Sequence, residues 1–200
     1  MYSFELRGLL IFGLPIWVII RGLNIVKKIK KGIKFNIRNE IFTNLFVIYI
    51  FLLVGITIFP INIGGIPHMQ ELSLIKMCNI NFLPFVAYFK GGFYFRSIIR
   101  NIIGNLLLLS PFILYLCVKY EKIRNLKSCV VVAFFISLSI ELIQLVMNIL
   151  NLSDMRVVDV EDLILNTIGG VISWYIFKIM YKGKIKSTVD EIYPQLIEDI

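Results

Sequence analysis

Long apolar runs alternate with short polar or basic stretches along the whole chain. Five of these runs are long enough to cross a hydrocarbon layer about 30 Å thick as helices, which takes roughly 20 residues each. The predicted spans cover residues 9–26, 41–60, 101–118, 129–150 and 162–181. The pattern predicts an all-α integral membrane bundle of about five transmembrane helices. Residues 1–200 are expected to form one domain, since little chain remains for a separate soluble unit.

The first predicted span is the weakest of the five. Its apolar run from Leu9 to Ile20 contains Pro15 and is followed directly by Arg21. A run this short also suits a segment that lies at the membrane interface, so crossing and interfacial placement both remain open. We expect Arg21 to extend its charged end toward a polar boundary while its stem stays in the apolar layer.

The composition agrees with a membrane protein, and the distribution of basic residues predicts which ends of the spans are cytoplasmic. Apolar residues make up 58% of the chain and the mean hydropathy is +0.83, above the range of soluble domains. Six Lys and Arg lie within residues 27–38, four within 119–127 and three within 182–186. Because cytoplasmic loops collect basic residues, these stretches and the C-terminus are predicted to be cytoplasmic, with the N-terminus outside. Topology thus accounts for the net charge of +8, and no nucleic-acid partner is expected.

The cysteines predict neither a disulfide framework nor a metal site. Cys78, Cys117 and Cys129 form no C-x-x-C pair, and two of them lie in or beside predicted spans. Free cysteine is one of the most frequently buried residue types, so these are expected to be small packing residues. We expect no metal and no cofactor.

Polar residues recur at helical spacing in three of the predicted spans. At about 100° per residue, the members on the fourth and last spans fall within arcs of roughly 60° and 80°, and those on the third span lie together near its outer end, so each span has one polar face. The last span carries Asp159, Asp162, Asn166, Gly169 and Ser173, the fourth carries Ser137, Glu141, Gln144 and Asn148, and the third carries Asn101, Gly104 and Asn105. Ionisable groups at membrane depth normally face a bundle interior or a wet cavity. We therefore predict that the three faces converge on a polar cleft open to the outer leaflet.

Glu141 is the most informative residue of these three faces. It lies about nine residues, or roughly 14 Å, below the outer end of its helix, so its carboxyl group must be paired, hydrated or protonated. In one interpretation, Glu141 is neutral and bonds Gln144 or Asn166 to tie two helices together. In the other, Glu141, Asp159 and Asp162 bind a cationic or hydrogen-bonding group of a ligand.

Two further features leave alternatives open. Arg156 pairs with Asp159 at a spacing of three residues, or else it neutralises another acid or holds a ligand phosphate. The carboxylates could ligate a hard cation such as Mg²⁺, but neither a D-D-x-x-D-like run nor a histidine partner supports a metal. Gly169 and Gly170 are expected to permit close helix approach. The candidate binding residues are Asn101, Asn105, Glu141, Gln144, Arg156, Asp159, Asp162 and Asn166.

Four segments in the second half of the chain carry a family resemblance. They are NFLPF at 81–85, NIIGNLLLLSPF at 101–112, SLSIELIQL at 137–145 and RVVDVEDLILNTIGG at 156–170. In this order they resemble the VanZ-like family of membrane proteins, with the signal strongest over residues 79–181. The resemblance implies a multi-span protein of a bacterial cell membrane. It also implies a contribution to low-level resistance against teicoplanin-type glycopeptides, because the family's named member confers it.

Three hypotheses for function follow. In the first, the protein is not an enzyme, and the outer cleft binds a lipophilic glycopeptide or a cell-wall lipid intermediate, with membrane lipids as its surroundings. In the second, it is an intramembrane enzyme acting on a lipid-phosphate or cell-wall lipid intermediate, with Glu141 or Asp162 as general base. Arg156 or Asn105 would then orient the phosphate. In the third, it is a structural partner of another membrane protein.

Overall fold

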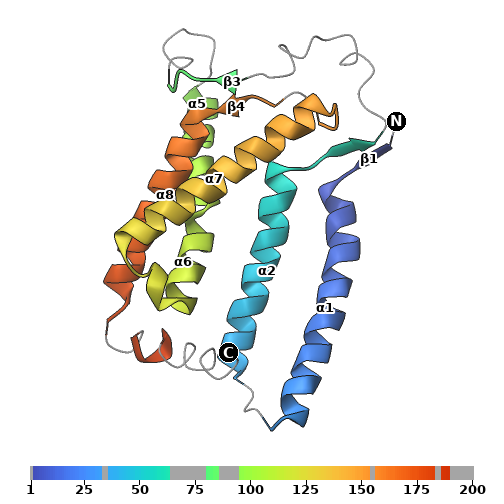
Figure 1. Ribbon diagram of the computed structural model, residues 1–200, viewed down its shortest axis with the longest axis vertical. Helices are drawn as coiled ribbons and strands as arrows, with labels where there is room; N and C mark the ends of the chain where they lie inside the picture. The colour runs from blue at the N-terminus through green and yellow to red at the C-terminus, as the bar shows by residue number, and fades with distance from the viewer. Residues whose placement is uncertain are drawn as a thin grey trace.

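Long apolar helices, packed side by side, make up most of the computed structural model (Figure 1). The structure describes residues 2–32, 36–63, 80–85, 95–153, 156–182 and 186–189. Five spans in these ranges are long and apolar enough to cross a membrane, which confirms the predicted all-α membrane bundle. They are α1 (Leu6–Lys30), α2 (Ile37–Thr57), α5 (Phe95–Leu108) with α6 (Ser110–Lys119), α7 (Leu126–Ile149) and α8 (Val160–Met180).

Side-chain caps set where three of these helices begin. The side-chain oxygens of Asn36, Asn125 and Asp159 accept backbone N–H groups at the starts of α2, α7 and α8, at 3.1, 2.8 and 2.8 Å. Such caps satisfy donors that the first turn of a helix leaves without partners. Asp159 therefore precedes α8, although the predicted polar face had placed it on the helix.

The third span consists of two helices. It begins at Phe95, six residues before the predicted start, since Arg96 and Arg100 are accommodated on exposed positions of α5. It is interrupted at Leu109, directly before Ser110 and Pro111. Proline has no N–H and is accommodated at the first turn of a helix without the loss of a hydrogen bond, so α6 starts there as a new helix.

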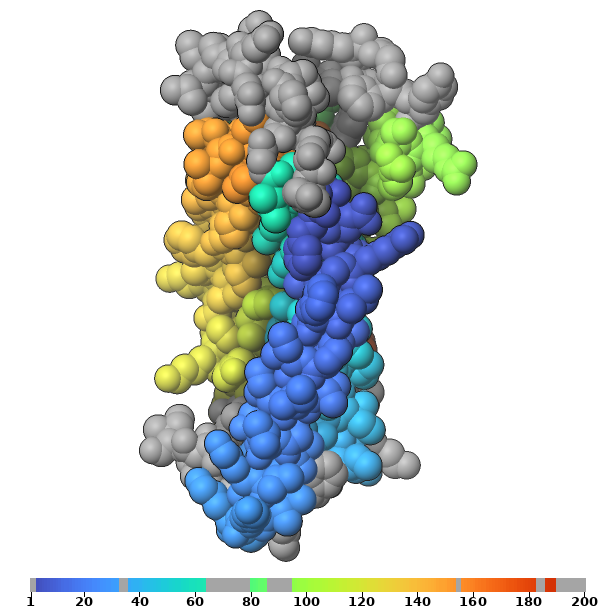
Figure 2. All heavy atoms as spheres, turned by 90° about the vertical axis from the view of Figure 1, so that its right-hand side faces the viewer, coloured from blue at the N-terminus to red at the C-terminus, as the bar shows by residue number. Residues whose placement is uncertain are grey.

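The first span, α1, is one continuous helix that lies along the outside of the molecule, with α2 behind it (Figure 2). That Arg21 extends toward a polar boundary of the membrane stays a prediction. Its guanidinium forms a salt bridge with Glu40 of α2 at 2.5 Å, and one turn away Trp17 donates to Asn44 at 2.9 Å. The charge of Arg21 is thus balanced by an opposite charge in the first turn of α2, one residue before the predicted start of the second span at residue 41.

The remaining spans pack tightly around α8. Gly169 lies against α5, where an added Cβ would be 2.0 Å from the carbonyl oxygen of Leu106. At Gly170, an added Cβ would be 2.6 Å from the Cβ of Ala133 on α7. This confirms that the two glycines permit close helix approach.

An apolar core lies between α6, α7 and α8. It includes Cys117 and Cys129, both fully buried and free, with their sulfur atoms 3.5 Å apart. These two cysteines are therefore packing residues, as predicted. Cys78 lies outside the described residues.

Short strands join the ends of the spans at one end of the bundle (Figure 1). β1 (Tyr2–Phe4) pairs antiparallel with β2 (Ile61–Ile63), and β3 (Ile80–Asn81) pairs parallel with β4 (Val158–Asp159). The end of α1, the start of α2 and the α6–α7 connection, with the short 3-10 helix η2 (Glu121–Ile123), lie at the opposite end together with the end of α8. The described residues of the three basic stretches thus share one end of the bundle, as the alternation of spans requires.

Candidate functional site

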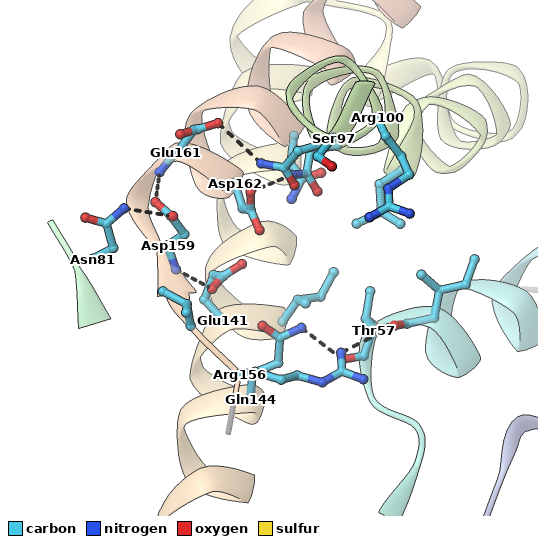
Figure 3. Close-up of a pocket in the computed structure, with 18 of the residues that line it drawn as sticks. Thr57, Asn81, Ser97, Arg100, Glu141, Gln144, Arg156, Asp159, Glu161 and Asp162 are labelled. Carbon is cyan, nitrogen blue, oxygen red and sulfur yellow. Dashed lines mark hydrogen bonds between the residues drawn. The ribbon is translucent and has the colours of Figure 1, made fainter. Parts of the chain in front are cut away.

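A polar cavity of about 790 Å³ lies at the strand-bearing end of the bundle, between α2, α5, α7 and α8 (Figure 3). We call it the polar cleft. Its walls combine carboxylate, amide and guanidinium groups with a few apolar side chains. They are formed by Ile56, Thr57, Asn81, Leu83, Ser97, Arg100, Asn101, Gly104, Asn105, Leu108, Ile140, Glu141, Gln144, Arg156, Val157, Asp159, Glu161, Asp162 and Asn166.

Two of the four carboxylates in the polar cleft hold the chain segments around it. Asp159 caps α8 and also accepts the side-chain amide of Asn81 at 2.9 Å, beside the β3–β4 pair. Glu161 is 2% exposed and accepts the backbone N–H of Phe85 at 3.1 Å and the amide of Asn101 at 3.3 Å. These bonds join the 80–85 segment and α5 to the start of α8.

The other two carboxylates, Glu141 and Asp162, are turned into the polar cleft from neighbouring helices (Figure 3). Glu141 on α7 accepts the backbone N–H of Asp159 at 3.1 Å. Asp162 on α8 accepts the amide of Asn105 at 2.5 Å. A carboxylate has about four acceptor positions, so both groups retain capacity for donors from a ligand. The alternative in which Glu141 bonds Gln144 or Asn166 is not what the structure shows, since both amides donate elsewhere.

Arg156 and Gln144 attach the end of α2 to the rest of the site. The guanidinium of Arg156 donates to the carbonyl oxygens of Thr57 and Phe59 at 2.5 and 2.7 Å, and Gln144 donates to Thr57 at 2.9 Å. The last carbonyls of a helix have no partners within it and carry its negative dipole end, so a cation fits there. This interhelical role was not among those that the sequence suggested for Arg156.

The backbone of Arg156 is held by Asn148 of α7. This fully buried amide accepts the N–H of Arg156 at 3.1 Å and donates to its carbonyl oxygen at 2.7 Å, and it also accepts Ser153 at 3.0 Å. The side-chain amide of Asn148 thus satisfies both backbone hydrogen-bonding groups of Arg156, as a neighbouring strand would. The polar face of α7 therefore has a structural end at Asn148 and a cleft-facing part at Glu141.

Asn166 lies one turn of α8 below Asp162 and is 1% exposed. Its amide nitrogen donates to Ser137 at 2.9 Å, whereas its side-chain oxygen accepts no hydrogen bond from the described residues. A buried acceptor without a donor is costly, and such groups call for a water or a ligand. Asn166 therefore places an unused acceptor in the wall of the polar cleft.

The structure brings all eight predicted residues to this one cavity: Asn101, Asn105, Glu141, Gln144, Arg156, Asp159, Asp162 and Asn166. Their part in binding remains a prediction. Sequence reasoning missed Ser97, Arg100 and Glu161. Ser97 could have been found, because it precedes Asn101 by one helical turn and extends the same face. Glu161 could not, since its partner Phe85 lies in a separate segment.

Over the described ranges, no group of three His, Cys, Asp or Glu side chains is placed to share a metal ion. The carboxylates instead accept amide donors, as in a hydrogen-bonding site. The chemistry available is binding of donors or cations and, at Glu141 or Asp162, acceptance of a proton.

Comparison with known proteins identifies the family. A family model described as VanZ/LLP1 matches residues 46–181, which include every residue that lines the polar cleft. No curated protein and no solved structure matches the chain. The match starts within α2, earlier than the motif-bearing segments, and covers well over half of the 200 residues. This multi-pass membrane protein therefore belongs to the VanZ/LLP1 family.

Proposed function

We propose that the polar cleft binds a lipophilic molecule of the cell envelope, and that this binding lowers susceptibility to teicoplanin-type glycopeptides. The cleft is predicted to face the outside, because the three basic stretches lie at the opposite end of the bundle. Glycopeptides and cell-wall lipid intermediates are both encountered on that side. The resistance part of the proposal comes from the family resemblance.

One observation carries the binding part: Glu141, Asp162 and the side-chain oxygen of Asn166 lie in one cavity and all retain acceptor capacity. Acceptors at membrane depth are costly unless donors reach them. A packed structural contact would satisfy them with neighbouring residues, as Glu161 and Asn148 are satisfied. The arrangement is therefore suited to a ligand that brings its own donors.

The test is antibiotic susceptibility in a sensitive Gram-positive host that expresses the protein. The unsubstituted protein should raise the teicoplanin concentration needed to stop growth, and Glu141→Gln and Asp162→Asn should each reduce that effect while the folded yield is maintained. Glu121→Gln is the matched control, because Glu121 is exposed at the opposite end of the bundle. Equal susceptibility with the empty vector and the unsubstituted protein would overturn the resistance claim.

A second candidate function is favoured by one further observation. Arg100 extends from α5 into the polar cleft on the side opposite Glu141 (Figure 3). A guanidinium facing carboxylates could orient the phosphate of a lipid-phosphate or cell-wall lipid intermediate while Glu141 or Asp162 acts as general base. The protein would then be an intramembrane enzyme.

Turnover separates the two candidates. Purified protein in nanodiscs is incubated with radiolabelled lipid phosphates and cell-wall lipid intermediates, and products are resolved by chromatography. An enzyme should release product, and Asp162→Asn or Glu141→Gln should abolish the release with folded yield intact. The binding function predicts no product from any of these lipids.

A further inference from the structure

The polar cleft contains charged groups of both signs, with the negative ones in excess. Four carboxylates line it, from α7 and from the start of α8, and two guanidiniums line it from other segments. The carboxylates belong to Glu141, Asp159, Glu161 and Asp162, and the guanidiniums to Arg100 and Arg156. Because Arg156 donates to the carbonyl oxygens at the end of α2, Arg100 is the cation that bears most directly on a ligand.

One hydrogen bond fixes how α7 and α8 face each other in the cleft. The amide of Asn166 donates to the hydroxyl of Ser137 at 2.9 Å, and the two helices run in opposite directions (Figure 1). One turn closer to the strand-bearing end, α7 carries Glu141 and α8 carries Asp162. These two carboxylates therefore lie on facing helices, one turn beyond the Asn166–Ser137 contact.

The side-chain oxygen of Asn166 adds a third acceptor at the base of this pair. Asn166 is 1% exposed, and its oxygen accepts no hydrogen bond from the described residues. A buried acceptor without a donor calls for a group that has not yet been counted. A primary ammonium has three N–H donors, one for each of Glu141, Asp162 and Asn166, whereas a hydroxyl has one and a quaternary ammonium has none. The excess of carboxylates also favours a cation over a neutral donor.

Arg100 supplies the opposite charge from the α5 wall. Its side chain extends into the polar cleft on the side opposite Glu141 (Figure 3). The one salt bridge among the residues that the structure describes joins Arg21 and Glu40, so no carboxylate of the cleft forms a salt bridge with Arg100. A guanidinium binds phosphate or carboxylate groups through two parallel N–H donors. An oxyanion of a ligand is therefore expected beside Arg100.

The wall of the cleft leaves room for a ligand between these two places. Gly104 follows Arg100 by one turn on the same face of α5, and an added Cβ there would meet nothing within 4 Å. The whole cleft has a volume of about 790 Å³, which is within the range of small-molecule sites. A ligand that lies across the cleft can therefore contact the guanidinium and the carboxylates together.

We propose that the ligand of the polar cleft is a zwitterion with a primary ammonium and an oxyanion a few atoms apart. Glu141, Asp162 and the side-chain oxygen of Asn166 accept from the ammonium, and Arg100 binds the oxyanion. A ligand with only an anion would bring no donors to the three acceptors, and one with only a cation would leave Arg100 without a partner. This inference rests on the proposed binding function and adds the chemical class of the ligand.

The test compares four decyl probes that carry a photoreactive diazirine next to the head group. They are decyl phosphoethanolamine, decyl phosphocholine, which lacks N–H donors, decyl phosphate, which lacks the ammonium, and decylammonium, which lacks the phosphate. Each is added to the full-length protein in phosphatidylcholine nanodiscs, and labelled peptides are identified by mass spectrometry after irradiation. The phosphoethanolamine probe should label residues of the polar cleft severalfold more than each of the other three.

Variants assign the two charges of the ligand to the two sides of the cleft. Arg100→Gln, at an exposed position, should lower labelling by the phosphoethanolamine probe to the level of the decylammonium probe and should not lower decylammonium labelling. Glu141→Gln keeps an oxygen for the N–H of Asp159 and should lower labelling by both probes. Arg96→Gln is the matched control, because Arg96 is exposed one turn earlier on α5 and does not line the cleft. It should change neither.

Unlabelled competitors identify the source of the zwitterion. Free phosphoethanolamine and lysophosphatidylethanolamine have the same charged groups, and only the second has a hydrocarbon chain. Competition by the lipid at a severalfold lower concentration would support a lipid head group as the ligand. Competition by both at the same concentration would support a free zwitterion.

Two results would overturn the inference, and they differ in what they say of the proposed function. Equal labelling of the cleft by the phosphoethanolamine and decylammonium probes, dependent on Glu141 and not on Arg100, would reject the zwitterion and retain a cleft that binds donors. Labelling of the cleft by none of the four probes would reject both.

Discussion

The amide of Asn105 on α5 donates to the carboxylate of Asp162 on α8 at 2.5 Å, across 57 residues of sequence. Both side chains belong to polar faces of helices that are otherwise apolar. Their contact shows that the faces meet inside the bundle, with the apolar sides left for lipid. The polar cleft is built on this contact, so its energetics can be tested directly.

Removing the donor should be more harmful than removing both polar groups. Asn105→Leu leaves the carboxylate of Asp162 without this partner, and we expect it to lower the free energy of unfolding by about 1–3 kcal/mol. Asp162→Leu added to Asn105→Leu should recover part of that loss. Thermal unfolding in detergent, followed by tryptophan fluorescence for the single and double variants, measures the difference. Additive losses would show that the two side chains are not coupled.

The contact of Gly169 with α5 predicts a steric effect of one methyl group. Gly169→Ala would place a Cβ 2.0 Å from the carbonyl oxygen of Leu106, so α5 and α8 must separate. We expect a loss of about 1–3 kcal/mol, as for other overpacked sites. Gly22→Ala is the control, because a Cβ there meets nothing within 4 Å. It should leave the midpoint of thermal unfolding unchanged or raise it, since alanine favours helix.

The ion pair of Arg21 and Glu40 predicts a strong coupling between α1 and α2. Arg21→Met or Glu40→Met alone leaves one charge without its partner, and each should cost about 3–5 kcal/mol. The double variant should lose much less than the sum. A double-mutant cycle of unfolding midpoints checks this, and a double variant less stable than both single variants would contradict the coupling.

The contacts of Arg156 predict that the forked shape of its guanidinium stabilises the protein more than its positive charge does. Its guanidinium bridges the carbonyl oxygens of Thr57 and Phe59, and an ammonium group cannot reproduce this fork. Arg156→Lys should therefore lower stability by about 1–2 kcal/mol although the charge is kept. Arg7→Lys, at an exposed position of α1, should have no measurable effect. Equal unfolding midpoints for both variants would contradict the interhelical role of Arg156.

The spacing of apolar and polar residues along the sequence was sufficient to predict the five spans and the convergence of their polar faces. Residues such as Asp162 and Asn166 recur at helical spacing, and the cost of exposing them to lipid leaves only the bundle interior for them. The close approach at Gly169 followed in the same way from small side chains in an apolar helix.

Contacts between separate segments could not be predicted in this way. The pairing of Arg21 with Glu40, and of Glu161 with Phe85, depends on which helices and loops become neighbours. Apolar periodicity does not specify this, because every lipid-facing helix offers a similar surface. The division of the third span at Leu109 was signalled by Pro111, but proline is also tolerated inside a membrane helix, as Pro15 shows in α1.

The most direct test of the account is the reactivity of two adjacent thiols on α5. Gly104 lines the polar cleft with room for a side chain, whereas Ile103 is exposed on the apolar side. In intact cells, Gly104→Cys should react with a membrane-impermeant maleimide, and Ile103→Cys should not, because a thiol in lipid stays protonated. Reaction of Gly104→Cys only in inverted vesicles, or no faster than Ile103→Cys, would contradict a polar cleft open to the outside.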